Sequence, residues 1–353
     1  MPGLIECPTV VSIHSLRGDS THVGCIEINP KLEQRLNYFM EPDTVIDNPT
    51  LEWLLEGDPA IRWQAKRDLL GEGGVAVEAE RRAVAIKGWG AGLLSRQDPG
   101  GTWGGGLYSP KWISTTYTLL LLRRLGLPAD NDQARRGCRL LLEAGLYTDG
   151  GINYSQKRAK HSETCITGLV LSILAYFRFQ DERLHRLVDH LIEQQMGDAG
   201  WNCQSYHGAV HSSFHTTISA LEGLREFEKF GDYRKDEVQS AQLRARDFLL
   251  EHRLYRSHRT GEVVHPAMTR FSFPPRWHYD VLRGLDYFQE AGAAKDGRLD
   301  DAIDLLLKKR RPDGSWPLQN RHPGRVYFEM EQPGKPSRWN TLRALRVLKW
   351  WMR

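Results

Sequence analysis

The sequence lacks several features that would place it in a class at once. Its five cysteines are odd in number and irregularly spaced, with no CxxC pair, so a disulfide framework is not expected. No apolar run approaches the roughly 18 residues of a membrane span. The first residues also lack the cationic and apolar segments of a secretory signal. We therefore expect a cytoplasmic protein with reduced thiols and no membrane span.

An excess of charge is also missing. The 353 residues include 48 Lys and Arg against 44 Asp and Glu, a net charge of +4, without the concentrated basic stripe of a nucleic-acid-binding protein. Strand-like alternation is confined to residues 8–30. We therefore predict an irregular or strand-bearing N-terminal extension over residues 1–48, an all-α domain over residues 49–353, and no nucleic-acid partner.

What the chain does have is 11 Trp and 33 Gly, and many of them recur in similar turns. The matching segments are QDPGGTWGGG (97–106), YTDGGINYSQ (147–156), QMGDAGWNCQ (195–204), SHRTGEVVHP (257–266) and RRPDGSWPLQ (310–319). Their anchor positions are separated by 49, 49, 62 and 53 residues. Such a period predicts a repeat of helical hairpins.

Each turn follows one helical pattern and precedes a second, more apolar one. The second helices carry few charges and the first are amphipathic, which favours an inner and an outer ring over an open superhelix. Residues 58–71 form a sixth, degenerate second helix with Asp58 as its N-cap. Aligning the second helices places five residues in one column: Thr116, Cys165, Thr217, His278 and Thr341.

The turn residues carry a resemblance. QDPGGTW (97–103) resembles the Q-x-x-x-G-x-W turn of the squalene and oxidosqualene cyclase repeats, with GDAGW (197–201) and PDGSW (312–316) as variants. The repeat is also similar to that of the β subunit of protein prenyltransferases. Over about residues 58–351, the resemblance implies an α/α toroid with six inner helices around an apolar cavity for an isoprenoid. We expect the Gln and Trp of the turns to be structural, because a buried indole N–H needs a partner.

The chemistry of these families is not carried over. The D-x-D-D motif with which squalene-hopene cyclases protonate their substrate does not occur, nor does the Asp-Gly-Cys segment of the prenyltransferase zinc site. The reaction is therefore unassigned. The first hypothesis is an isoprenoid-processing or isoprenoid-binding enzyme. The alternatives are a non-catalytic toroid that acts as a binding or scaffold protein, and a metal-dependent enzyme acting on another substrate.

Candidate site residues gather where the inner helices begin, at one face of the ring. Cys165, His215, His278 and Asp280 carry the ligand types that zinc prefers, and we predict them as a metal site, with zinc as the implied cofactor. The other interpretation of each is a helix cap or a packed core residue. A metal-free site would instead use the pairs His278 with Asp280 and His215 with Glu163 as proton donors, with His211 nearby.

Aromatic side chains near the same helix starts are candidates for binding the substrate and stabilising cationic intermediates, although core packing is the other interpretation. The long loop of residues 324–340 is a candidate lid or partner surface, in which cationic side chains would hold a diphosphate. The predicted substrate-binding residues are Trp112, Tyr117, Phe214, Trp277, Tyr279, Arg338, Trp339 and Asn340. The predicted ligand is a hydrophobic small molecule, and the oligomeric state stays open.

Overall fold

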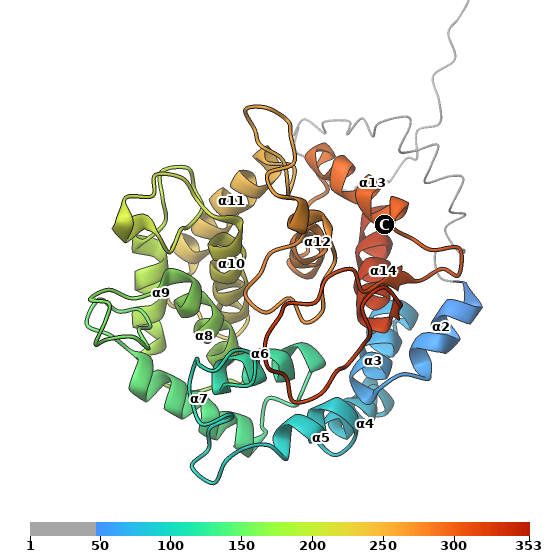
Figure 1. Ribbon diagram of the computed structural model, residues 1–353, viewed down its shortest axis with the longest axis horizontal. Coiled ribbons are helices and arrows are strands. Elements are labelled where there is room, and N and C mark those ends of the chain that lie inside the picture. The colour runs from blue at the N-terminus through green and yellow to red at the C-terminus, as the bar shows by residue number, and fades with distance from the viewer. Residues whose placement is uncertain (1–46) are drawn as a thin grey trace, which may run out of the picture.

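The helices form two concentric rings around one axis (Figure 1). The structure, a computed structural model, describes residues 47–353, so the predicted N-terminal extension lies outside the described residues except for its last two. The inner ring consists of α3 (Pro59–Gln64), continued by the π-helix η1 (Ala65–Leu70), α6 (Thr115–Leu125), α8 (Thr164–Tyr176), α10 (Phe214–Glu228), α12 (Val281–Glu290) and α14 (Arg338–Met352). The outer ring consists of α2 (Asn48–Leu55), α4 (Gly74–Arg82), α5 (Gly88–Leu94), α7 (Asp132–Gly145), α9 (Leu184–Glu193), α11 (Lys235–Glu251) and α13 (Asp300–Lys308). The predicted all-α toroid with six inner helices is confirmed.

The connections contain little regular structure. Four short 3₁₀ helices are η2 (Ala83–Ala85), η3 (Ser205–His207), η4 (Pro266–Thr269) and η5 (Gly297–Leu299). Strands β1 (Trp316–Pro317) and β2 (Pro336–Ser337) pair antiparallel, with Trp316 opposite Ser337. No helix within residues 47–353 is long and apolar enough to cross a membrane.

The degenerate sixth repeat folds as predicted. The Asp58 carboxylate accepts a hydrogen bond from the backbone N–H of Ala60 at 2.9 Å, and Pro59 is the first residue of α3. An acidic cap followed by proline satisfies the free N–H groups of a helix start without straining it. The ring is then closed by α14, where Arg346 donates to the Gln64 side chain at 3.0 Å and Lys349 donates to the carbonyl of Leu69 at 2.7 Å.

The tryptophans of the repeated turns are fully buried and identically bonded. The indole N–H of Trp103, Trp201 and Trp316 donates to the carbonyl ten residues earlier, at 2.8, 2.6 and 2.8 Å. Gln97 and Gln195 act similarly, since each side-chain amide donates to its own turn and to the next outer helix. These residues are structural, as expected, because each bond joins the end of an outer helix to the turn that follows it.

The same turns correct the alignment of the inner helices. The backbone N–H of the anchor residue donates to a threonine hydroxyl of the following inner helix in four turns. The anchors Trp103, Ile152, Trp201 and Trp316 donate to Thr115, Thr167, Thr217 and Thr341 at 3.1, 2.9, 3.0 and 2.9 Å. Thr217 and Thr341 were placed correctly, but Thr116 and Cys165 were not. The loop lengths differ between repeats, so an alignment on leucines alone misses the register by one or two residues.

One turn residue gives a testable prediction. Ala199 has a φ of 74°, whereas glycine occupies the equivalent left-handed positions Gly101, Gly150 and Gly314. A left-handed residue with a Cβ costs roughly 1–2 kcal/mol, and the extra chain entropy of glycine offsets about 0.5–1 kcal/mol of that gain. Ala199→Gly should therefore raise the free energy of unfolding by up to about 1 kcal/mol, measured by urea denaturation. The reverse change Gly101→Ala should lower it, and a loss of stability in Ala199→Gly would contradict the argument.

Candidate functional site

The starts of the inner helices, and the loops that lead into them, bring aromatic and imidazole rings together near a lysine. We call this group, Lys111, Trp112, His215, Trp277 and His278, the mouth. The rings of Trp277 and His278 stack at 3.7 Å between centroids, and those of His215 and His278 meet edge-on at 5.8 Å. The ammonium group of Lys111 lies 5.8 Å from the ring centroid of Trp112 and 5.6 Å from that of Trp277. The mouth therefore holds a cation against aromatic faces, an attractive arrangement.

Three further rings extend the mouth. Tyr117 meets Trp112 edge-on at 4.8 Å, and Tyr108 adds a third aromatic face 5.6 Å from the Lys111 ammonium. On the other side, His322 stacks on His278 at 3.8 Å between centroids. Tyr108 and His322 were not among the sequence-predicted residues, because neither lies at the start of an inner helix.

The mouth histidines are neutral in the folded protein at neutral pH. Burial lowers the pKa of His278 to about 3 and that of His215 to about 4, and neighbouring positive groups act in the same direction. The Nδ1 atom of His215 accepts a hydrogen bond from the backbone N–H of Tyr279 at 2.8 Å. That bond holds the neutral imidazole in one tautomer. These rings are therefore poor sources of a proton, which weakens the predicted acid pairs.

Asp280 has a structural position. It is the N-cap of α12, where it accepts a hydrogen bond from the backbone N–H of Arg283 at 2.9 Å. Its other oxygen accepts from the N–H and the hydroxyl of Ser272 at 3.0 and 2.6 Å. These contacts are those of a buried helix cap rather than of a proton donor.

Glu163 and Cys165 lie together at the start of α8. Burial raises the pKa of the Glu163 carboxyl, against the opposing charge of Lys111. The backbone N–H of Cys165 donates to the sulfur of Cys203 at 3.2 Å, and the hydrogen bond between the two thiols, with burial, raises the pKa of Cys165. Cys165 is therefore a free thiol whose hydrogen-bond partner is another free cysteine.

The structure does not bring the four predicted zinc ligands together as one group. Among residues 47–353, no group of three or more His, Cys, Asp or Glu side chains is placed to hold a metal ion. The prediction relied on the alignment column that joined Cys165 to His278, and that column is wrong for Cys165 by two residues. Asp280 is moreover engaged as a helix cap.

The other predicted residues are divided between packing and polar contacts. Phe214 packs against Phe248 of the outer helix α11 at 5.5 Å between centroids, and the hydroxyl of Tyr279 donates to the carbonyl of Leu254 at 2.7 Å. The side chains of Arg338 and Asn340 donate hydrogen bonds to the carbonyls of Trp53 and Pro317, at 2.9 and 3.0 Å. The carbonyl of His211 accepts a hydrogen bond from the side chain of Asn202 at 2.7 Å. Trp339 stacks on Phe273 at 4.2 Å inside the ring.

A loop lies across the ring on the side of the mouth. We call residues 318–335, between β1 and β2, the strap; it is the dark red loop over the ring centre in Figure 1. The indole N–H of Trp112 donates to the carbonyl of Pro323 at 2.9 Å, and the hydroxyl of Tyr327 donates to the carbonyl of Ile113 at 3.0 Å. A void of about 40 Å³ lies beneath the strap, lined in part by Trp112 and Leu121.

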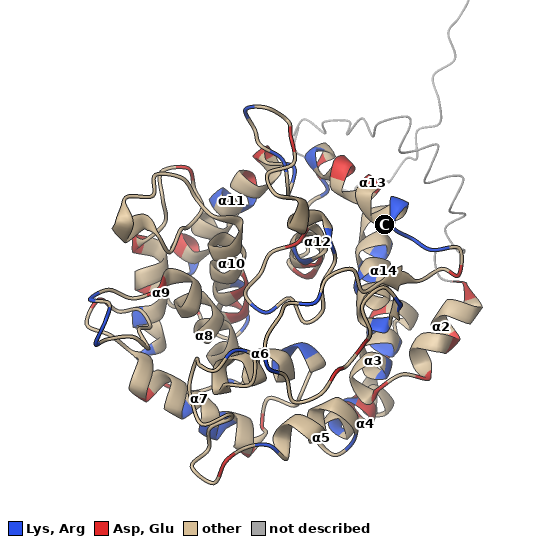
Figure 2. Ribbon diagram, in the orientation of Figure 1, with Lys and Arg blue, Asp and Glu red and all other residues tan. Residues whose placement is uncertain are grey.

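The ring interior, in contrast, is lined by many charged side chains. The apolar cavity that the resemblance implied is therefore not found in this region. A cavity of about 300 Å³ is lined by eight cationic and five anionic side chains, an excess of three positive charges. Figure 2 shows these charges on α6, α10, α12 and α14 around the ring centre. The cations are Arg67, Arg123, Arg124, Arg225, Lys229, Arg283, Arg343 and Arg346; the anions are Asp68, Glu222, Glu226, Asp286 and Glu290.

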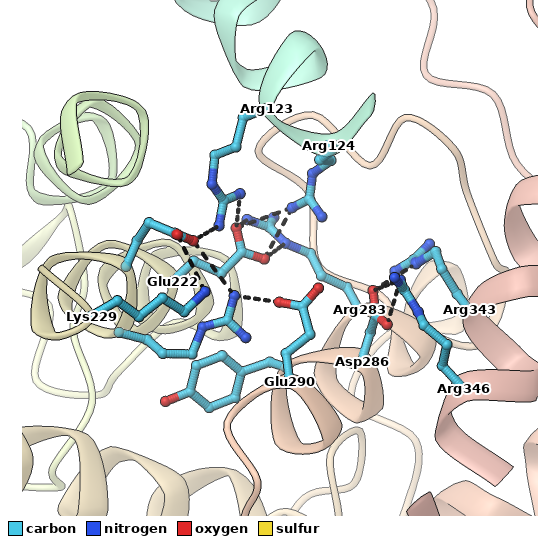
Figure 3. A network of polar contacts seen from close by, with 12 residues as sticks. Arg123, Arg124, Glu222, Lys229, Arg283, Asp286, Glu290, Arg343 and Arg346 are labelled. Atoms are coloured by element: carbon cyan, nitrogen blue, oxygen red, sulfur yellow. Dashed lines mark hydrogen bonds and ion pairs between the residues drawn. The ribbon is translucent and has the colours of Figure 1, made fainter. Parts of the chain in front are cut away.

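Ion pairs organise this cavity (Figure 3). Glu222 lies between Arg124 and Arg283, at 3.0 and 2.8 Å, and Asp286 pairs with Arg343 and Arg346, both at 3.0 Å. Sequence reasoning missed this network, because the inner helices were interpreted as carrying few charges. The available signal was the spacing within α10 and α12, where charged residues three or four positions apart share one helix face.

Comparison with known proteins reveals structural likeness only. No model of a protein family matches the chain, and no curated protein does. The structure is similar to that of the type II terpene cyclase MstE from Scytonema in complex with geranylgeranyl dihydroxybenzoate, with 19% identity, a TM-score of 0.43, and coverage of 91% of this chain and 98% of that one. A protein from Actinoplanes is similar over 86% of this chain and 98% of its own, with 15% identity and a TM-score of 0.46. At these identities the likeness concerns the fold alone.

Proposed function

We propose that the protein binds an isoprenoid-type ligand at the mouth of its ring and processes it. The observation that carries this proposal is the position of the Lys111 ammonium, which faces the rings of Tyr108, Trp112 and Trp277 at 5.6–5.8 Å. The aromatic faces that attract this ammonium group would stabilise a developing carbocation in its place. The cationic intermediates of isoprenoid chemistry need such an environment.

A specific observation favours a second candidate, a toroid that binds such a ligand without turnover. The mouth histidines have low pKa values, about 3 for His278 and about 4 for His215 and His322. Neutral imidazoles do not protonate an alkene. Catalysis at this mouth would therefore depend on ionisation of a leaving group rather than on an acid from these histidines.

In either case the ligand has to displace the strap, because a void of about 40 Å³ is too small for a prenyl chain. Gly324 is the close contact between the strap and the mouth: a Cβ on this residue would lie 2.3 Å from the indole nitrogen of Trp112. Gly324→Ala should therefore push the strap off Trp112 and open the mouth.

The test is binding and turnover of farnesyl and geranylgeranyl diphosphate, measured by calorimetry and by mass spectrometry of the products. Trp277→Ala, which removes one of the three aromatic faces, should weaken binding about tenfold or more, the typical cost of losing an aromatic anchor. Gly324→Ala should accelerate association.

The matched control is Trp350→Ala, near the far end of α14, which should leave binding unchanged. Product formation supports the enzyme, and binding without product supports the second candidate. If neither the wild type nor Gly324→Ala binds either probe, the isoprenoid proposal is wrong.

A further inference from the structure

The charged cavity inside the ring has more cationic groups than its own anions satisfy. Buried N–H groups without a hydrogen-bond partner remain on Arg225 (Nε and Nη1), Arg343 (Nη2) and Arg346 (Nε). These side chains are only 6%, 2% and 7% exposed. Leaving a buried charged donor unbonded costs stability, so natural proteins rarely retain several in one cavity without a purpose.

Arg124 shows the same excess of positive charge. It donates to Glu222, yet its Nε has no partner. Burial lowers the pKa of Arg124 to about 10, and the charges of Arg283, Arg123 and Arg343 act in the same direction, against that of Glu222. The positive groups therefore lie close enough to repel one another.

Helix dipoles explain only part of this set. A cation in the last turn of a helix offsets the negative carbonyl end, and Arg124 and Arg225 have that position in α6 and α10. Arg343 and Arg346 lie well before the last turn of α14. A purely structural ion-pair network would also leave fewer N–H groups unbonded.

The cavity has the size and the access that a ligand needs. Its volume of about 300 Å³ is at the lower end of the range of roughly 300–1,000 Å³ for small-molecule pockets. Lys229 and Glu290, whose side chains are 45% and 38% exposed, line it at the ends of α10 and α12. The cavity therefore opens to solvent near the carboxyl ends of inner helices, away from the mouth.

We propose that this cavity binds a small polyanion, a molecule with clustered oxyanion groups such as a diphosphate or several carboxylates. Guanidinium groups bind such groups with paired, charge-assisted hydrogen bonds. Arg124, Arg225, Arg343 and Arg346 all line the cavity and supply guanidinium donors, and the excess of three positive charges balances the ligand. This site goes beyond the isoprenoid function and does not depend on it, because its ligand enters by another opening.

The test uses the full chain and three inorganic or small organic probes, diphosphate, phosphate and citrate, at constant ionic strength. Thermal unfolding and calorimetry should show saturable stabilisation by diphosphate or citrate, and a weaker effect of phosphate. Arg124→Gln should lower the affinity for the tighter-binding probe by about tenfold or more, because a charge-assisted hydrogen bond is lost. Glu290→Gln should act in the opposite direction and tighten binding, because it removes a competing anion.

The matched control is Arg139→Gln on the exposed face of the outer helix α7, which should leave binding unchanged. Opposite effects of the two cavity variants support the site even if one of them is less stable. The proposal is overturned if diphosphate and citrate stabilise the protein no more than chloride does. It is also overturned if both cavity variants bind like the wild type. No prenyl chain is involved, so failure here and failure of the isoprenoid proposal are distinguishable.

Discussion

Replacing Glu222 with Gln should lower the free energy of unfolding by about 3–5 kcal/mol, the usual cost of breaking a buried ion pair from one side. The Glu222 side chain is 6% exposed and lies 2.8 Å from Arg283 and 3.0 Å from Arg124. The variant leaves these guanidinium groups buried beside each other without their common anion. The loss comes less from the attraction removed than from the positive charges that remain.

The pH dependence of stability provides an independent check. Burial acts to raise the pKa of Glu222, but the charges of Arg124 and Arg283 outweigh it and hold the pKa well below 4.5. A carboxyl group with a depressed pKa in the folded state stabilises the protein above the pKa of the unfolded chain, and this contribution is lost as pH falls further. The stability difference between wild type and Glu222→Gln should therefore be constant near neutrality and shrink below about pH 4.5.

An exposed ion pair supplies the control. Asp247, with 64% of its side chain exposed, pairs with Arg298 at 3.2 Å. Asp247→Asn should change the free energy of unfolding by less than about 1 kcal/mol in the same urea denaturation series. Equal effects of the two substitutions would show that the charges in the ring are solvated, which would also remove the basis of the polyanion site.

The fold was predictable because its determinants are local and repeated. Where a turn has both Trp and Gln, these residues bond within their own hairpin or to the next, so Trp103 and Gln97 have the same roles as Trp201 and Gln195. The cap at Asp58 is likewise decided by its immediate neighbours. Such features can be identified from spacing without knowledge of the rest of the chain.

The candidate site was less predictable because it depends on contacts between distant hairpins. His322 reaches His278 only because the strap crosses the ring. The sequence suggested an acid or a metal ligand at Asp280, because it does not reveal that the hydroxyl of Ser272 and the backbone N–H of Arg283 both donate hydrogen bonds to this carboxylate. The partners of Glu222 come from α6 and α12, and charges that appear unremarkable within one helix become a network only when the ring closes.

A close contact between two inner helices at their glycines predicts a second large loss of stability. A Cβ on Gly168 of α8 would lie 2.5 Å from the backbone oxygen of Ser219 and 2.7 Å from the backbone nitrogen of Ala220, both in α10. Gly223 of α10 approaches α8 in return, since its Cβ would lie 2.6 Å from the backbone oxygen of Gly168. Backbone atoms of a packed helix cannot rotate away as a side chain can, so Gly168→Ala has to separate α8 from α10.

We expect Gly168→Ala to lower the free energy of unfolding by about 3 kcal/mol, at the upper end of the usual cost of overpacking, despite the better helix propensity of alanine. Urea denaturation measures the loss. Gly197→Ala is the matched control, because nothing lies within 4 Å of its added Cβ and its backbone is not in the left-handed region, so this variant should be neutral or slightly more stable. If Gly168→Ala were as stable as Gly197→Ala, α8 and α10 would not be in contact as closely as their glycines imply. Separation of α8 from α10 would also displace His215, the second residue of α10 and part of the mouth, so Gly168→Ala should weaken isoprenoid binding as well.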